Sequence, residues 1–331
     1  MQVGDGTPVL KRTVVVSSPG IHLAHRDGQL VLLKEGAELG KVPMEDMGVL
    51  ILDGPGLSLT SAVLEGLATA GAVLISCGAD HMPAAILHPL AGNSTHNERL
   101  RHQVETSQPL RKLLWARLVR AKLLAQAAAV PSETARRQIE HLASGVKSGD
   151  REAAEAQGAR IYWEAFFADC DPGQILLPFR RNRDGSPPNA LLNYGYTVLR
   201  AAVARALCGA GLHPALGVQH HSRYDSFALA SDVMEPFRPW VDRRVKQLVL
   251  AGSLRIDRES KAHLLQVLTD PVQYGDVSGP LLAATERCCS SLAECYLSAS
   301  RGAPAPVVVE DLVLPSWPLN LEPDQHDEEE E

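Results

Sequence analysis

Residues 211–242 carry side chains with the chemistry of a divalent metal site. His220 lies in a polar loop, and a helix-compatible run follows it from about Phe227. The run is mostly apolar, yet it contains Asp232 and Glu235, which are three residues apart and therefore project from nearly the same helical face. Carboxylates on an apolar face are costly to bury unless a cation compensates them. This spacing fits a mixed nitrogen and oxygen metal site, and it also fits a solvated helix face beside a loop histidine.

A further candidate carboxylate lies in residues 151–163. Glu155 shares a helical face with Tyr162 or Trp163, so we expect it beside the aromatic, buried side of a helix. Glu164 is expected to face solvent. A structural role is the alternative for Glu155, because glutamate is a good helix former.

Two basic segments are candidates for phosphate contacts. The loop 178–188 carries Arg180, Arg181 and Arg183, and guanidinium groups form bidentate contacts with phosphates. Residues 98–122 hold seven Lys and Arg against two acids. Such a surface would follow a phosphate backbone. A solvated connector and a charged helix face are the ordinary alternatives for these two segments.

Composition bounds the class of protein. A chain of 331 residues fits about two domains, and 45% hydrophobic with 21% charged residues is enough for a sizeable core. The formal net charge of −7 equals the seven acids of residues 322–331, so the rest of the chain is formally neutral. An acidic total therefore does not exclude a polyanionic partner.

Several classes of site lack support in the sequence. The six cysteines have no CxxC spacing, which disfavours a zinc ribbon or a redox motif. There is no G-x-G-x-x-G or Walker A motif, so a nucleotide cofactor is not indicated. We find no signal peptide and no apolar run of about 20 residues, the length that a membrane-spanning helix needs. We therefore expect a cytoplasmic protein with reduced thiols and no membrane segment.

The elements that must position these residues predict an α+β fold. Residues 1–92 read as a β-rich domain that includes a hairpin at 21–33 with its turn at Asp27-Gly28. Residues 93–302 read as a helical catalytic domain, and residues 303–331 as a Pro-rich and acidic tail, expected to be disordered. Helices are predicted at 110–129, 132–143, 150–168, 190–210, 227–250, 257–269 and 278–299.

Several segments, taken in order, resemble a known family: the CRISPR-associated endonuclease and integrase subunit of the spacer-acquisition complex, in its type II form. They are residues 42–52 (VPMEDMGVLIL), 57–61 (LSLTS), 148–150 (SGD), Glu155-Ala156 with Tyr162-Trp163, 189–196 (NALLNYGY), 211–220 (GLHPALGVQH) and 232–239 (DVMEPFRP). The resemblance runs from about residue 10 to about residue 270 and is most specific in NALLNYGY and in the stretch from His220 to DVMEPFRP.

The resemblance implies a metal site. Carried over by motif, its ligands are Glu155, His220 and Glu235, with Asp232 as an acidic neighbour that could assist and His221 as an adjacent second histidine. Carboxylates and one imidazole suit Mg²⁺ or Mn²⁺. In such a family the 3′-hydroxyl of a short DNA fragment attacks the edge of a repeat by transesterification, and water in its place gives nuclease activity.

The resemblance also implies partners and a role in antiviral defence. They are double-stranded DNA, a second copy in a homodimer, and a small CRISPR-associated subunit of the integrase complex. We expect Arg180, Arg181, Arg183 and the basic face of residues 99–122 to hold DNA. Two other readings remain: a metal-dependent phosphoesterase acting on small substrates, and a non-catalytic helical scaffold that binds DNA.

Overall fold

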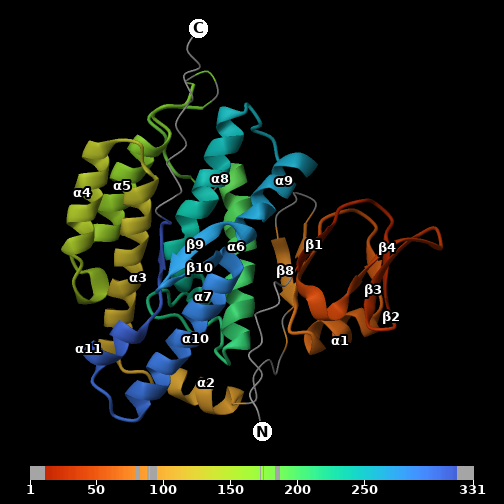
Figure 1. Ribbon diagram of the computed structural model, residues 1–331, viewed down its shortest axis with the longest axis horizontal. Helices are drawn as coiled ribbons and strands as arrows, with labels where there is room; N and C mark the ends of the chain where they lie inside the picture. Colours follow the sequence, from red (N-terminus) through yellow and green to blue (C-terminus); the bar gives the residue numbers. More distant parts are fainter. Residues whose placement is uncertain are drawn as a thin grey trace. The chain divides into compact units, whose positions relative to one another are not determined.

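The computed structural model describes residues 12–78, 83–87, 89, 95–171, 173, 175–182 and 187–318. The chain divides into two compact units, Met1–Ser94 and Thr95–Glu331. The first unit is built from strands and the second is mainly helical, so the predicted α+β class is confirmed (Figure 1). Among the described residues, no helix is both long enough and apolar enough to cross a membrane.

The N-terminal unit contains two sheets. One has the order β1 (Arg12–Val16), β5 (Met47–Leu52), β7 (Val73–Cys77) and β8 (Pro83–Leu87), with β1, β5 and β7 parallel. The other has the order β4 (Ala37–Pro43), β3 (Gln29–Lys34), β2 (His22–Arg26) and β6 (Ser58–Leu59). The predicted β2–β3 hairpin is confirmed: Asp27 and Gly28 both have positive φ, as tight hairpin turns require.

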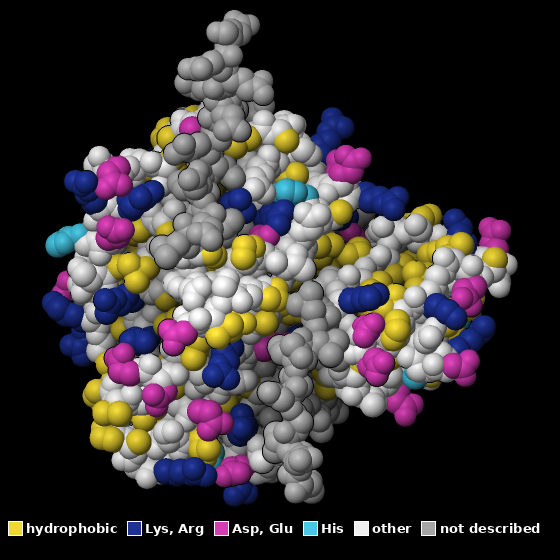
Figure 2. Space-filling model, in the orientation of Figure 1, with side chains coloured by type: hydrophobic (Ala, Val, Ile, Leu, Met, Phe, Trp, Pro, Cys, Tyr) yellow, Lys and Arg dark blue, Asp and Glu magenta, His cyan; other side chains and the backbone are white. Residues whose placement is uncertain are grey.

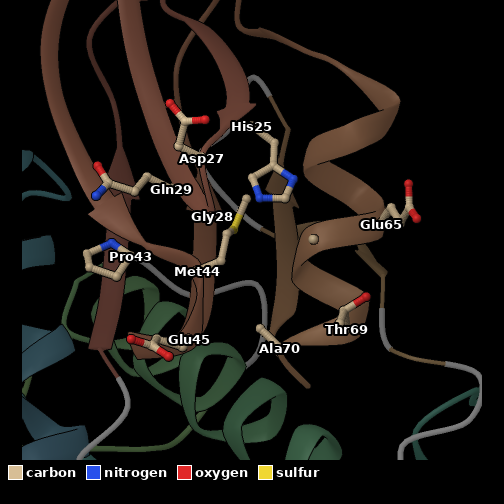
Figure 3. Close-up of a pocket in the computed structure, with 11 residues that line it drawn as sticks. His25, Asp27, Gly28, Gln29, Pro43, Met44, Glu45, Glu65, Thr69 and Ala70 are labelled. Atoms are coloured by element: carbon tan, nitrogen blue, oxygen red, sulfur yellow. The ribbon is translucent and has the colours of Figure 1, made fainter.

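A cavity of about 690 Å³ lies in this unit, between the hairpin strands and α1 (Ser61–Thr69). Figure 3 shows the imidazole of His25 between β2 and α1, with Met44 below it. Gly66 of α1 allows this approach, because a Cβ there would lie 3.0 Å from Nδ1 of His25. None of the metal ligands expected from the sequence lines this cavity.

In the helical unit, α3 (Gln108–Ala129) packs against α4 (Glu133–Ser144), α5 (Ala154–Phe166) and α8 (Arg238–Leu250) (Figure 1). Ser107 begins α3 and Ser132 begins α4, because each side chain accepts a hydrogen bond from the first helical turn. Gly158 allows α5 to approach α3 closely, since a Cβ there would lie 2.2 Å from Cδ2 of Leu123. This unit also contains α2 (His96–Val104), α6 (Asn189–Gly209), α9 (Arg258–Leu265) and α10 (Leu281–Ser300).

The predicted single helix 227–250 is wrong in one respect that matters for the site. It is divided into α7 (Ala228–Val233), a 3-10 turn η3 (Glu235–Phe237) and α8. Pro236 lies inside the turn and Pro239 at the start of α8. Proline has no N–H to donate and clashes with the preceding turn, so the regular helix cannot continue through this segment. Glu235 therefore begins a tight turn instead of lying mid-helix.

The C-terminal part differs from the expected tail. Residues 303–318 include α11 (Ala305–Val308), η5 (Val309–Asp311) and β11 (Pro315–Ser316), which pairs with β9 (Pro271–Tyr274). Burial of Val308, Val309 and Leu312 orders this segment despite its prolines. The hairpin of β9 with β10 (Val277–Pro280) was not predicted either. The acidic residues 322–331 lie outside the described residues.

Candidate metal centre

Glu155 lies in the first turn of α5, where the preceding loop fixes the helix start. Asp150 accepts hydrogen bonds from the backbone N–H groups of Ala154 (2.9 Å) and Glu155 (3.1 Å). The loop reaches this position through positive φ values at Gly149, Asp150 and Ala153. A carboxylate that accepts from exposed N–H groups stabilises a helix N-terminus, so the Ser148-Gly149-Asp150 segment sets where Glu155 begins its turn.

Glu235 is buried in η3 and has two cationic neighbours. Its Oε1 lies 2.7 Å from Nη2 of Arg238, and its Oε2 lies 2.6 Å from Nζ of Lys122. The ammonium of Lys122 is therefore the positive group in direct contact with the buried Oε2. A buried carboxylate oxygen needs a cation beside it, and carboxylate oxygens are also ligands of hard divalent ions.

Lys122 of α3 joins the two glutamates. Its Nζ lies 2.7 Å from Oε1 of Glu155 and 2.6 Å from Oε2 of Glu235. The lysine side chain is 9% exposed and that of Glu155 is 30% exposed, so the carboxylate of α5 is the more open to solvent. Two carboxylates that are far apart in the sequence therefore meet around one positive charge.

Asp232 of α7 is completely buried and holds the loop that carries His220. Its Oδ2 accepts from the backbone N–H groups of Val218 (2.7 Å) and Gln219 (2.9 Å). Its Oδ1 accepts from Nδ1 of His220 at 2.5 Å. Gly217 is required here, because a Cβ would lie 2.3 Å from the carbonyl oxygen of His220. With Nδ1 occupied, Nε2 is the nitrogen of the neutral imidazole that can bind a metal.

The charges of the site act on one another's pKa values. The hydrogen bond to Asp232 raises the pKa of His220; partial burial opposes this, and the charges of Asp232, Glu235 and Glu155 add to it. Burial acts to raise the pKa of Glu235, but the charges of Arg238 and Lys122 outweigh burial and lower it. These couplings place His220 in the electrostatic field of both glutamates.

The pKa of Lys122 also depends on burial and on the charges of the two glutamates, which act in opposite directions. Burial acts to lower it, but the charges of Glu235 and Glu155 outweigh burial, so the pKa is raised and the ammonium form is stabilised.

Behind Glu235 lies a buried polar network. The Arg238 guanidinium stands over the ring of Tyr196, 4.6 Å from its centroid. Tyr196 and Tyr162 both donate hydrogen bonds from their hydroxyls to Asp242, at 2.5 and 2.9 Å. Burial raises the pKa of Asp242 to about 7, although the two hydroxyls oppose this shift. The network connects α5, α6 and α8. It holds the Tyr196 ring against which Arg238 packs, so it helps to orient the guanidinium toward Glu235.

The structure brings together Glu155 and Glu235 through Lys122 and sets His220 on Asp232, while His221 is exposed. Within the described part of the chain, no three His, Cys, Asp or Glu side chains are already arranged as a metal-binding group. The ammonium of Lys122 lies in contact with both carboxylates.

The basic segments divide into inward and outward residues. Arg180 is exposed, whereas Arg181 is partly buried and donates to Asn189 and Asn193 at 2.9 and 2.5 Å. Arg183 lies outside the described residues. Sequence reasoning placed Lys122 on a DNA-facing helix surface and missed its role here. The signal was present, because Lys122 follows Leu118 and Val119 at helical spacing and so falls on the apolar face of α3.

Other basic residues near α3 are paired with acids. Arg99 lies 3.1 Å from Glu294, and Arg117 lies 2.5 Å from Glu310. Figure 2 shows Lys and Arg side chains scattered among Asp and Glu over this face of the helical unit, without a single basic stripe. The exposed cations of this region are Arg101, Lys112 and Arg120.

Three comparisons place the chain among known proteins. The family model described as CRISPR associated protein Cas1 matches residues 14–269. A relative from Neisseria meningitidis, named CRISPR-associated endonuclease Cas1, is 37% identical over 79% of this chain and 84% of its own.

Solved structures show the same fold at lower identity. A casposase bound to integration product has a TM-score of 0.72 at 17% identity and covers 87% of this chain and 91% of its own. A chain of a Cas6-RT-Cas1–Cas2 complex has a TM-score of 0.69 at 16% identity, over 90% of this chain and 36% of its own. The resemblance read from the sequence is confirmed: the chain belongs to the Cas1 family of CRISPR-associated proteins.

Proposed function

We propose that this protein is a metal-dependent DNA endonuclease and integrase that inserts short DNA fragments into a CRISPR array. Its family consists of enzymes named endonucleases, which favours DNA chemistry over a small-molecule phosphoesterase or a non-catalytic scaffold. The observation that carries the proposal for the site is the convergence of Glu155 and Glu235, from separate helices, on one buried cation. A place built to hold one positive charge between two carboxylates is suited to hold a divalent ion.

The residues present fit such an ion. Glu155 and Glu235 supply oxygen ligands and His220 supplies one nitrogen, a set that suits Mg²⁺ and tolerates Mn²⁺ well. Asp232 would act as the outer partner of His220, because a carboxylate on the other ring nitrogen fixes the tautomer and the ring orientation of a ligating histidine. Arg238 keeps Glu235 ionised, and an ionised carboxylate is the form that binds metal.

A bound ion would polarise the scissile phosphate and stabilise charge on the leaving 3′ oxygen. The protein's own side chains position the residues that would bind the ion. Arg238 holds Glu235 in place, and Asp242 holds the hydroxyl of Tyr196, the ring under Arg238. Asp232 fixes the orientation of the His220 ring through its contact with Nδ1. The attacking group in integration is the 3′-hydroxyl of the incoming DNA, so no side chain has to form a covalent link to the substrate.

DNA is held largely through its phosphates in this proposal. Arg180 and the exposed Arg101, Lys112 and Arg120 near α3 are cations that can make such contacts. Arg223 and Tyr224 form an exposed cation–π pair, with a separation of 4.7 Å, three and four residues after His220. A loop that joins an aromatic ring to a guanidinium can contact both bases and backbone. Arg181 is assigned a structural role.

The proposed assembly is a homodimer joined to a small CRISPR-associated subunit, acting on double-stranded DNA in the cytoplasm. The casposase structure contains an integration product and the multi-subunit structure contains Cas1 with Cas2, which supports DNA and a second CRISPR-associated protein as partners here. All six cysteines are free thiols, in keeping with a reducing compartment.

An integration assay tests the proposal. The purified protein is mixed with its partner subunit, a short duplex DNA and a repeat-bearing plasmid, with Mn²⁺, with Mg²⁺ or with a chelator. Strand transfer is expected only with a divalent ion, and Glu155→Gln, His220→Ala and Glu235→Gln should each reduce it to background. Glu164→Gln, an exposed carboxylate of the same helix as Glu155, is the matched control. Full activity in any of the three site variants would contradict the assignment.

A further inference from the structure

Lys122 is an unusual residue for its position in α3. The side chain is 9% exposed in a helix whose neighbouring turns contribute Leu118, Val119 and Leu123 to the core. Long lysine side chains normally extend to keep the ammonium in water. Here the ammonium is directed inward and stays charged, because two carboxylates compensate for the water that it lacks.

Lys122 contacts the two carboxylate oxygens that a metal ion between Glu155 and Glu235 would bind. Nζ lies 2.7 Å from Oε1 of Glu155 and 2.6 Å from Oε2 of Glu235. Mg²⁺ binds carboxylate oxygens at about 2.0–2.1 Å. An ion bound to both oxygens would therefore occupy the space that the ammonium group now fills, and the two like charges would repel each other strongly at that separation. The ammonium and the ion cannot both lie between the same two oxygens.

Arg238 is a different kind of neighbour. It contacts Oε1 of Glu235, whereas Lys122 contacts Oε2, and it stacks on Tyr196. It can stay in place while the other oxygen, Oε2, binds a metal. Lys122 therefore contacts the oxygens that the ion would bind, whereas Arg238 lies beside them.

We infer that Lys122 is the internal counter-ion of the metal-free site and that a divalent ion binds by displacing its ammonium group from Glu155 and Glu235. This inference rests on the proposed metal site and adds a property to it. The lysine keeps the buried carboxylates compensated when no metal is bound, and it sets the metal concentration at which the site fills. Once displaced, the ammonium moves on its flexible stem to solvent or to a phosphate of bound DNA.

The test measures Mn²⁺ affinity of the full-length protein without DNA, from the electron paramagnetic resonance signal of free Mn²⁺. Lys122→Met keeps the length of the side chain and removes its charge. Its dissociation constant for Mn²⁺ should fall about tenfold or more, because the ion no longer has to displace a positive charge that is in contact with both carboxylates. Lys122→Arg keeps the charge and should stay close to the wild-type value.

Two matched controls separate displacement from a general charge effect. Lys246→Met removes another buried lysine, paired with Asp169 at 2.7 Å, and should leave Mn²⁺ affinity unchanged. Arg238→Gln removes the positive charge beside Glu235 without vacating the metal position, so it should tighten binding less than Lys122→Met does. Equal tightening in Arg238→Gln and Lys122→Met would overturn the inference, and so would wild-type or weaker affinity in Lys122→Met.

A second readout covers the case in which Lys122→Met folds poorly without metal. Melting temperatures are measured with and without Mn²⁺ for the wild type, Lys122→Met and Lys122→Gln. The rise with Mn²⁺ should be larger in both variants than in the wild type, because the metal then neutralises carboxylates that have lost their counter-ion. An equal or smaller rise in both would overturn the inference. If the wild type and Glu235→Gln alike bind no Mn²⁺, the proposed metal site itself fails, which is a separate result.

Discussion

The substitution Asp232→Asn removes one charge from the carboxylate that builds the His220 loop. The carboxylate is fully buried and accepts from Val218 N–H at 2.7 Å, from Gln219 N–H at 2.9 Å and from His220 Nδ1 at 2.5 Å. Asparagine keeps one acceptor oxygen and turns an NH₂ group toward donors. A hydrogen bond to a charged group contributes about 1.5–3 kcal/mol, and a buried donor left unsatisfied costs about 1–3 kcal/mol.

Losing one such bond and stranding the buried Val218 N–H should lower the free energy of unfolding by about 2.5–6 kcal/mol. Urea unfolding of the metal-free protein measures this loss. The pKa of His220, followed by NMR against a His220→Ala spectrum, should fall toward its ordinary value of about 6.5, because the Asp232 charge and hydrogen bond raise it in the wild type.

The pH dependence of the stability difference follows from the direction of that shift. A raised pKa in the folded state means that the His220 contribution is complete below about pH 6.5 and is lost as the pH rises through the folded-state pKa. The difference between the wild type and Asp232→Asn should therefore be largest below that pH and decrease above it. Neutral surface substitutions change the free energy of unfolding by no more than about 0.5 kcal/mol. A change within that range for Asp232→Asn, with an unchanged His220 pKa, would refute the assigned role of Asp232.

Three other perturbations test neighbouring parts of the account. Gly217→Ala forces a Cβ to within 2.3 Å of the His220 carbonyl oxygen, so it should lower the free energy of unfolding in urea by about 1–3 kcal/mol. An unaltered urea midpoint would be inconsistent with this loop geometry. Burial raises the pKa of Asp242 to about 7, so the free energy of unfolding of the wild type should decrease as the pH rises from about 4 to 7. This decrease with pH should be smaller in Asp242→Asn. Parallel plots of unfolding free energy against pH for the two proteins would argue against a buried, ionising Asp242. Arg180→Ala should reduce the slope of log K for DNA binding against log salt concentration by roughly 0.9, without lowering the melting temperature. Arg181→Ala should lower the melting temperature, because it removes hydrogen bonds to α6. The reverse pattern would exchange the roles of the two arginines.

The sequence predicted the elements around the site better than the contacts within it. The hairpin turn at Asp27-Gly28 and the helix that carries Glu155 follow from local rules of turn chemistry and periodicity. The 3-10 turn at Glu235 was missed because periodicity over residues 227–250 was weighed above the two prolines inside that run. Pro236 alone was sufficient to predict the break.

The interior contacts could not be predicted from spacing alone. Lys122 and Arg181 were both counted as surface cations, since basic residues are rarely buried unless they are paired. Arg181 contacts Asn189 and Asn193, which lie 8 and 12 residues further along the chain in α6. The partners of Lys122, Glu155 and Glu235, lie in α5 and η3 and become its neighbours only through tertiary packing. The buried Tyr162–Asp242 bond spans 80 residues for the same reason. Motif resemblance supplied the expected ligands, but it gave no indication of the cation between them.

Anomalous diffraction from crystals grown with Mn²⁺, with and without duplex DNA, tests the proposed metal centre most directly. The account predicts one manganese peak within about 2.0–2.3 Å of oxygens from Glu155 and Glu235 and of Nε2 of His220, with the Lys122 ammonium withdrawn from between the carboxylates. A manganese ion bound elsewhere, or Lys122 still bridging the two glutamates when the protein is saturated with metal and DNA, would contradict it.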